Sequence, residues 1–558
     1  MKNYDVIILG GGLAGLTLSI QLKRSKPDIK ILVLERRKSN APKSAHKVGE
    51  STVELASYYL REVIGIKDYL EKHELPKYGL RFFFKSHNKE DIASRVELGP
   101  RKWLYTPSHQ LDRGTLENHL AKTTQEYGTE FLLDASVKDV EFGKDSSVVT
   151  YLHEGQEVKA TCRWVADATS RSSFLKRKLG FAKPMEHAPN AVWWRLKGVI
   201  DISDWSDNQE WVNYPEVKLR YLSTVHFLDK GYWVWVIPLG TKNTSIGIVA
   251  DPAVHPFDTF DTYEKALEWL KVNEPLCYKM LEPETPNKMD FKILKHFAHH
   301  TGRLYDGGQR WGVTGEAGAF LDPFYSPGSD LISLNNTWLS DLILRELNGE
   351  DVQFRAEIYE QTHLGLLDAW IPIYQNKYLL MGQAQIMTAK ILWDWAIYWA
   401  VPALLFTNKA FTDLRMLQKL FSTPDSLGQK FGRLHDRMQK LFLDWSPYDT
   451  EIFERKFVDP VDLSYMLDFQ TTITQQHGDQ LIAKVGENMA ILEQVAAEIF
   501  RRVSHQAKGT PLDMAVNPYT MDLENPVPVH NESFNVPRNE KIIRDIEAMW
   551  FYTEKQPA

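Results

Sequence analysis

The sequence predicts an α/β protein with a parallel-sheet core, a second β-sheet in the middle of the chain and a helical C-terminal region. Near the N-terminus, a glycine-rich turn stands between an apolar run and a helical pattern. Strand-like stretches dominate residues 191–251, and the pattern beyond residue 354 is helical almost to the end. A chain of 558 residues is long enough for about three or four domain-sized units.

The first structural unit lies within residues 4–35 and consists of a strand, a glycine turn, a helix and a second strand. The apolar run 5–9 leads into Gly10-Gly11-Gly12-Leu13-Ala14-Gly15, and the run 29–34 ends at Glu35. In this pattern Gly10 makes the tight turn, Gly12 allows close approach of a pyrophosphate, and Gly15 allows helix and strand to pack. The helix N-terminus offers free N–H groups to phosphates, and the carboxylate of Glu35 suits ribose hydroxyls. A Rossmann-like dinucleotide-binding unit is predicted; the alternative is a glycine turn in an unrelated α/β domain.

Bulk composition excludes several classes of function. A net charge of −7 and a pI near 6.2 give no basic surface for nucleic acid. The two cysteines, Cys162 and Cys277, form no CxxC pair, so we expect neither a disulfide framework nor a metal site. The predicted first strand begins almost at the N-terminus, which leaves no room for a signal peptide. We therefore expect a cytoplasmic enzyme.

The apolar run 391–406 is the one stretch that raises the question of a membrane. It covers sixteen residues, fewer than the roughly 20 that a bilayer span requires, and it contains Asp394 and Pro402. A buried helix or hydrophobic groove is the favoured interpretation. Membrane contact through 391–406, or a lid over a lipophilic substrate, is the alternative. The C-terminal helices are expected to close a substrate pocket or to form a dimer interface, and the oligomeric state stays open.

Four separated motifs point to a known family. They are the glycine fingerprint, Gln110-Leu111-Asp112-Arg113, Asp167-Ala168-Thr169-Ser170-Arg171 and Gly315-Glu316-Ala317. Over roughly residues 4–380 the chain resembles the flavoprotein monooxygenases of the p-hydroxybenzoate-hydroxylase fold, and within them the flavin-dependent halogenases. The resemblance implies FAD as cofactor. The cofactor-binding residues that it implies are Gly10, Gly12, Ala14, Gly15, Glu35, Gly49, Glu50, Ser51, Thr52, Arg113, Asp167, Glu316, Pro323 and Gly328.

Three stretches resemble halogenases more than ordinary hydroxylases. They are Val48-Gly49-Glu50-Ser51-Thr52, the W-x-W-x-I-P run 233–238, and Lys77 within Pro76-Lys77-Tyr78-Gly79. The resemblance implies that reduced FAD and oxygen convert halide into hypohalous acid, which travels through a tunnel to Lys77. A lysine suits this role where apolar surroundings depress its pKa. The alternative is a solvated surface lysine.

The substrate side departs from the family pattern at Ser326-Pro327-Gly328. Because proline has no N–H, one expected halide donor is missing, and the Ser326 hydroxyl or the N–H groups after Pro327 would have to compensate. Tyr325 stands where tryptophan halogenases carry a glutamate, so we do not expect free tryptophan as substrate. Catalytic roles are predicted for Lys77 and Ser326. Substrate or tunnel contacts are predicted for Trp233, Trp235, Phe324 and Tyr325, with core packing as the alternative for the two tryptophans.

The predicted architecture is therefore α/β, with an FAD-binding Rossmann-like core, a substrate-side β-sheet and a helical C-terminal region. Segments 1–185 and 300–350 form the FAD-binding part, 186–299 the substrate-side sheet and 351–558 the helical region. The halogenase resemblance implies a separate flavin reductase that delivers FADH2, and no second glycine fingerprint in a strand-helix context is present for NAD(P)H. The expected substrate is a phenol or pyrrole, free or bound to a carrier protein. The alternatives are an FAD-dependent monooxygenase of the same fold without halide use, and a non-catalytic flavin-binding or membrane-docking protein.

Overall fold

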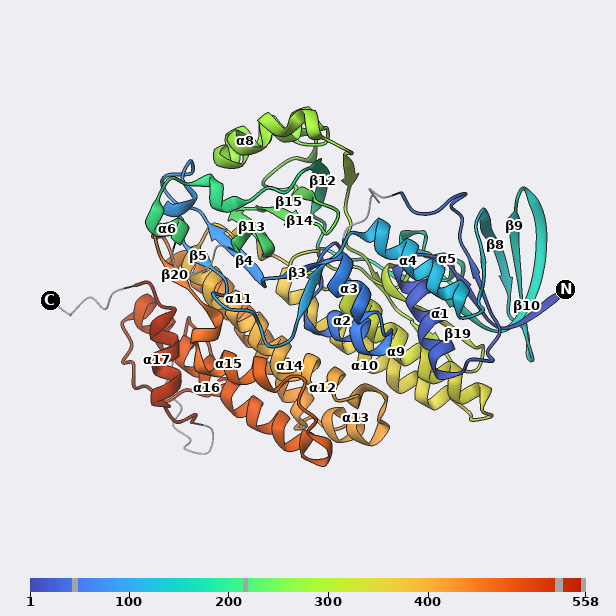
Figure 1. Cartoon of the computed structure of the whole chain (residues 1–558). Helices are drawn as coiled ribbons and strands as arrows, with labels where there is room; N and C mark the ends of the chain where they lie inside the picture. The colour runs from blue at the N-terminus through green and yellow to red at the C-terminus, as the bar shows by residue number, and fades with distance from the viewer. Residues whose placement is uncertain (43–48, 214–218, 527–534, 553–558) are drawn as a thin grey trace.

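The computed structural model describes residues 1–42, 49–213, 219–526 and 535–552 (Figure 1). Two eight-stranded sheets and a group of C-terminal helices make up the molecule. The orange and red helices of Figure 1 lie together on one side, beneath the green strands of the second sheet. The predicted fold class, an α/β protein with a helical C-terminal region, is confirmed.

The first sheet contains the N-terminal strand and has the order β18-β19-β10-β1-β2-β7, with β8 and β9 attached to β10. Its strands are β1 (Lys2–Leu9), β2 (Ile31–Leu34), β7 (Glu130–Leu132), β8 (Ala135–Glu141), β9 (Ser147–His153), β10 (Gln156–Asp167), β18 (Tyr305–Asp306) and β19 (Trp311–Val313). Leu9 pairs with both Leu34 and Asp167, and Asp167 pairs with Val313 in parallel register. The loops that follow these strands therefore meet at one edge of the sheet, where ligands bind in such folds.

The helices of this part are α1 (Leu13–Ser25), α4 (Arg113–Glu126), α5 (Phe174–Lys178) and α9 (Gly328–Leu347). Helix α1 packs against both α4 and α9. Because α9 comes from more than 300 residues further along the chain, the nucleotide-binding part is assembled from distant segments.

The second sheet has the order β16-β12-β15-β14-β13-β4-β5-β20. Its strands are β4 (Leu80–Phe84), β5 (Glu97–Leu98), β12 (Asn190–Lys197), β13 (Thr224–Asp229), β14 (Tyr232–Pro238), β15 (Asn243–Ala250), β16 (Lys292–Leu294) and β20 (Phe457–Val458). The strands β4, β5 and β20 lie outside the segment 186–299, so this sheet also recruits the N-terminal and C-terminal parts of the chain. The division of the chain into domains stays a prediction.

Short elements stand between the main strands and helices along the chain. They are α2 (Glu54–Tyr58), α3 (Lys67–His73), β3 (Leu75–Lys77), β6 (Ser108–Gln110), β11 (Ala182–Lys183), α6 (Gln209–Asn213), α7 (Tyr263–Asn273), α8 (Pro275–Leu281) and β17 (His300–Thr301). Strand β3 pairs with β6 in a two-stranded sheet of its own.

The C-terminal region is a group of packed helices. They are α10 (Gln353–Tyr374), α11 (Ala384–Tyr398), α12 (Leu404–Thr407), α13 (Leu414–Phe421), α14 (Leu427–Trp445), α15 (Ser464–Thr472), α16 (Leu481–Lys508) and α17 (Glu540–Ala548). Helix α11 continues into α12 through a π-helical turn, Trp399–Ala403, that contains Pro402. A π-helical turn accommodates the missing proline N–H.

The run 391–406 belongs to this continuous helical stretch. Within the described residues, Ala384–Thr407 is the one helical stretch whose length and composition would allow it to cross a membrane, and 94% of the tested window is buried inside the protein. Ile391, Leu392 and Ala396 have no exposed surface. The favoured interpretation, a buried helix, is confirmed.

Candidate active site

The glycine turn after β1 has the backbone that the fingerprint predicts. Gly10 has φ +111°, and a Cβ there would lie 2.3 Å from the carbonyl oxygen of Ala168. A Cβ on Gly15 would lie 2.0 Å from the carbonyl oxygen of Gly10, so neither position has room for a side chain. Gly12 precedes α1 and has no side-chain cap, which leaves the first N–H groups of the helix for a phosphate. Ala14 lies in that first turn, and its carbonyl accepts from Asn336 at 3.0 Å.

Glu35 closes this site from the end of β2. Its carboxylate accepts from the N–H of Gly11 at 2.9 Å and from the N–H of Arg37 at 2.8 Å. The guanidinium of Arg37 lies 3.2 Å from the same carboxylate. The acid is thereby held beside the glycine turn. The turn, the open helix N-terminus and the carboxylate together fit the ADP half of FAD.

Asp167 and Glu316 follow neighbouring strands, β10 and β19, but their carboxylates have different hydrogen-bond partners. The buried Asp167 carboxylate accepts from the N–H and hydroxyl of Thr169 and from the N–H of Leu175, at 2.6–2.9 Å. Burial raises the pKa of Asp167. Its role in this structure is to shape the turn before α5. Glu316 is half-buried and accepts from the Ser170 hydroxyl at 2.6 Å, so its carboxylate stays at the edge of the site.

The motif 49–52 lies against the segment 109–113, while Val48 is outside the described residues. Thr52 exchanges hydrogen bonds with the backbone of His109, and the Ser51 hydroxyl lies 2.9 Å from that of Thr224. The guanidinium of Arg113 donates to the carbonyl of Gly49 at 3.4 Å. These contacts fix the backbone of the motif between the two sheets.

Glu50 does not face solvent. Its carboxylate lies 3.3 Å from the guanidinium of Arg195, a fully buried side chain of β12 that also has Asp112 and Asp290 within 4 Å. Burial raises the pKa of Glu50 to about 7, and Arg195 opposes that shift. In this structure Glu50 is thus part of a buried ionic cluster beneath the second sheet.

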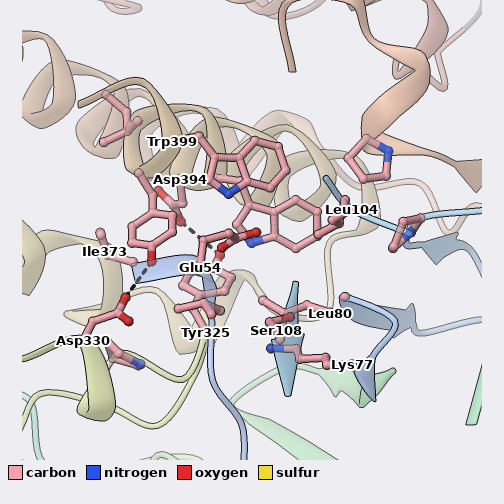
Figure 2. A pocket seen from close by; sticks show the side chains of 18 of the residues that line it. Glu54, Lys77, Leu80, Leu104, Ser108, Tyr325, Asp330, Ile373, Asp394 and Trp399 are labelled. Atoms are coloured by element: carbon pink, nitrogen blue, oxygen red, sulfur yellow. Dashed lines mark hydrogen bonds between the residues drawn. The ribbon is translucent and has the colours of Figure 1, made fainter. Parts of the chain in front are cut away.

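A cavity lies between helices α10 and α11 on one side and α2, β3, the start of β4 and the start of α9 on the other (Figure 2). Most of its wall is aromatic or aliphatic, as expected for a pocket that takes a flat apolar ligand. The aromatic residues of the wall are Tyr325, Trp370, Tyr374, Trp395, Tyr398 and Trp399. Four ionisable residues interrupt it, and these are Glu54, Lys77, Asp330 and Asp394. Helices α10 and α11 therefore form a wall of this cavity.

Lys77, at the end of β3, lies in this wall. The residue is only 4% exposed, and its Nζ donates to the carbonyl of Thr52 at 2.7 Å. Burial lowers the pKa of Lys77 from 10.5 to about 7, although the carboxyls of Glu54 and Asp330 act to raise it. The alternative of a solvated surface lysine is wrong. An amine with this pKa is able to lose its proton near neutral pH.

Sequence reasoning missed the two acids beside Lys77. Glu54 begins α2, and one of its oxygens accepts from the Gln470 amide at 2.9 Å. Asp330, in the first turn of α9, accepts from the N–H of Ala56 and from the Tyr398 hydroxyl, both at 2.8 Å. Burial raises the pKa of Asp330 to about 7. Each acid lies within four residues of a predicted site residue, Thr52 or Gly328, so their position in the sequence was a usable signal.

The loop that precedes α9 has an unusual backbone. Tyr325 and Ser326 have φ values of +70° and +62°, a left-handed conformation that is costly for residues other than glycine. The N–H of Ser326 donates to the carbonyl of Pro323 at 2.9 Å, which closes the turn. Tyr325 and Pro327 line the cavity, whereas Gly328 begins α9. The first N–H groups of that helix, from Gly328 onward, have no acceptor within the helix.

Trp233 and Trp235 are buried on β14, next to the cavity rather than in its wall. The indole N–H of Trp233 donates to the Tyr378 hydroxyl at 3.0 Å, and that of Trp235 to Ser245 at 3.1 Å. The ring of Trp233 lies 5.3 Å from that of Phe324, which in turn lies 4.4 Å from the ring of Tyr325. An aromatic layer thus connects the W-x-W-x-I-P strand to the cavity, and its predicted role as a tunnel wall stays a prediction.

Comparisons with known proteins show what the chain is similar to. A family model described as an FAD binding domain matches residues 3–246. The flavin-dependent halogenase chlA of Dictyostelium discoideum is 25% identical, over 80% of this chain and 81% of that protein. A chlorinase of pyrrole-2-carbonyl on a peptidyl-carrier protein, from Pseudomonas fluorescens, is 26% identical over 60% of this chain and 74% of its own.

Solved structures show the same fold. The halogenase PltM superposes with a TM-score of 0.60 at 16% identity, over 88% of this chain and 95% of its own. A flavoprotein/dehydrogenase from Cytophaga hutchinsonii superposes with a TM-score of 0.55 at 20% identity, over 70% of this chain and 88% of its own. The protein is an FAD-dependent enzyme, and FAD is its cofactor. Within that class the chain is similar to flavin-dependent halogenases over most of its length.

Proposed function

We propose that this enzyme halogenates an electron-rich aromatic ring, using FADH2, oxygen and a halide ion. The observation that carries the proposal is Lys77, a buried amine with a pKa of about 7 in the wall of an aromatic-lined cavity. Bound reduced FAD supplies, together with oxygen, the oxidation of halide to hypohalous acid. The protein then has to deliver that reagent to one ring and keep it away from water.

Different residues are proposed to hold the amine, the aromatic ring and the halide. The carbonyl of Thr52 accepts from the Nζ of Lys77 at 2.7 Å, which fixes the position of the amine. The aromatic wall of Trp370, Trp395 and Trp399 suits a flat ring and excludes water. On the flavin side, the Ser326 hydroxyl and the N–H groups at the start of α9 are the donors proposed for halide. The positive end of the α9 dipole favours an anion there.

A phenol or pyrrole is the proposed substrate, either free or bound to a carrier protein. The relative from Pseudomonas fluorescens acts on a pyrrole that a peptidyl-carrier protein holds, and PltM has been crystallised with phloroglucinol. Both rings are electron-rich. We propose a separate flavin reductase as the source of FADH2, and the cytoplasm as the place of the reaction.

The rate of ring halogenation is expected to rise with pH, with a midpoint near 7. Below that midpoint Lys77 is an ammonium, and above it the free amine is available to react with hypohalous acid as a nucleophile. The single-turnover rate of bromination, measured between about pH 5.5 and 9, checks this. A rate that falls through pH 7 would instead show that the ammonium acts as a hydrogen-bond donor.

The product itself tests the proposed function. The FAD-loaded enzyme, a flavin reductase, NADH and phloroglucinol are incubated with bromide, with chloride or without halide. We expect brominated or chlorinated phloroglucinol by mass spectrometry only where the corresponding halide is present. Denatured enzyme with the complete reductase system is the control for free oxidants.

A second candidate function is favoured by Pro327, which removes one N–H from the expected halide site. An FAD-dependent monooxygenase of the same fold would add oxygen to the ring in every arm of the experiment above, whether or not halide is present. A hydroxylated product without halogen in the bromide arm would therefore replace our proposal with this one.

A further inference from the structure

A second polar group lies in the cavity wall, on different elements from those that carry Lys77. Asp394 belongs to α11, and its carboxylate accepts from the Tyr325 hydroxyl at 3.0 Å (Figure 2). The same carboxylate accepts from Lys390 at 2.5 Å and from Gln439 at 2.7 Å. All four side chains are at least nine-tenths buried. Asp394 and Tyr325 line the cavity, whereas Lys390 and Gln439 lie behind them.

This ionic group is unexpected in its surroundings. Lys390 and Asp394 occupy one turn of a helix whose other buried residues are mostly apolar. A buried ion pair loses hydration on both partners, and apolar residues of similar size would often be as stable. Stability alone therefore does not account for a charged pair that reaches the wall of a cavity.

The hydrogen-bonding capacity that remains indicates what this group is able to bind. Among the described residues, the Tyr325 hydroxyl has one partner, Asp394, so its oxygen is still able to accept a hydrogen bond. Trp395 also lines the cavity, and its buried indole N–H has no partner in the described part of the chain. The wall thus offers an acceptor and a donor, and a ligand hydroxyl matches both.

The cavity wall contains a second tyrosine–carboxylate pair, Tyr398 and Asp330, whose hydrogen bonds are made within the fold. The Tyr398 hydroxyl donates to Asp330 and accepts from the N–H of Leu55 at 2.9 Å. The second oxygen of Asp330 accepts from the N–H of Ala56. These bonds join α2, α9 and α11, so this pair is already used within the fold.

We propose that Tyr325, Asp394 and Trp395 form a subsite for a hydroxyl group of the aromatic substrate. The subsite holds the hydroxyl by one accepted and one donated hydrogen bond, and thereby sets which ring carbon faces Lys77. The inference rests on the proposed function and narrows it, because a phenol fits both partners whereas a pyrrole N–H only donates. Tyr325 and Asp394 are specificity-determining residues in this account.

Binding of two size-matched probes tests the subsite without any turnover. Phloroglucinol carries three hydroxyls. In 1,3,5-trifluorobenzene fluorine atoms replace them, so this probe has no hydrogen-bond donor. Calorimetric titration of the FAD-loaded enzyme is expected to give at least about tenfold tighter binding of phloroglucinol. In Tyr325→Phe and Asp394→Asn this preference is expected to shrink to about threefold or less. Tyr325→Phe keeps the ring and the ion pair, so it remains informative if Asp394→Asn fails to fold.

The control variant is Tyr378→Phe. Tyr378 donates to the buried Asp322 at 2.8 Å and is not part of the cavity wall, so its loss removes the same chemical group elsewhere. We expect this variant to keep the preference of the wild type. A wild-type enzyme without preference, or a preference that survives in Tyr325→Phe, would overturn the subsite. Trapping of hypobromous acid from the wild type decides the proposed function separately, since it needs no aromatic substrate.

Discussion

Lys77→Met is expected to abolish ring halogenation while FAD binding persists. Methionine keeps the apolar stem of the buried side chain but has no amine to take up or position the halogenating reagent. Removal of such a positioned group typically lowers a rate by about 10²–10⁴-fold, and we expect a loss of at least a hundredfold. Chromatography of brominated phloroglucinol measures the rate, and flavin absorbance reports the bound FAD.

The matched control for this variant is Lys377→Met. Lys377 is also 4% exposed, burial lowers its pKa to about 7 as well, and it is not in the wall of the cavity. A buried lysine is thereby removed without removing a side chain of the cavity wall. Equal losses in the two variants would show that the effect of Lys77→Met is structural. Unchanged halogenation in Lys77→Met would show that Lys77 is not required for the reaction.

Gly10→Ala is expected to destroy FAD binding. The new Cβ would lie 2.3 Å from the carbonyl oxygen of Ala168, and φ +111° is a strained conformation for alanine. The turn has to shift, and it presents the phosphate-binding N–H groups of α1. We expect the Kd of FAD to rise by at least about a hundredfold, which corresponds to about 2.7 kcal/mol. Equilibrium dialysis with detection of flavin absorbance measures it.

Gly486→Ala is the control for the glycine substitution. Gly486 lies within α16, and a Cβ there would meet nothing within 4 Å. Alanine favours a helix over glycine by about 1 kcal/mol, so the free energy of unfolding is expected to rise slightly and FAD binding to stay unchanged. Normal FAD affinity in Gly10→Ala would mean that the turn does not hold the cofactor.

The parts of the site that the sequence predicts are those with a local pattern. The unit from β1 to Glu35 is recognisable because glycine spacing, strand and helix follow one another within about thirty residues. Lys77 was predicted from its neighbours in sequence, and burial in the structure supplies the depressed pKa that the role requires. The run 391–406 was too short for a membrane span, and it is a buried helix.

The acids of the cavity belong to no local motif, although Glu54 and Asp330 lie within four residues of predicted site residues. Glu54, Asp330 and Asp394 are separated by 276 and 64 residues, and each reads alone as an ordinary helix residue. Only the packing of α2, α9 and α11 brings them to one cavity. Desolvation by the C-terminal helices then raises the pKa of each acid, an effect that depends on tertiary burial and not on neighbours in sequence.

We propose that this enzyme oxidises halide although Pro327 interrupts the expected halide site. The most direct test is a single turnover of the enzyme with chemically reduced FAD and oxygen, with and without bromide, in the presence of monochlorodimedone as the trap. Flavin absorbance in the same sample verifies the bound FAD. We predict bromide-dependent bromination of the trap. Hydrogen peroxide release without any bromination of the trap, in enzyme that holds its full FAD, would contradict the claim.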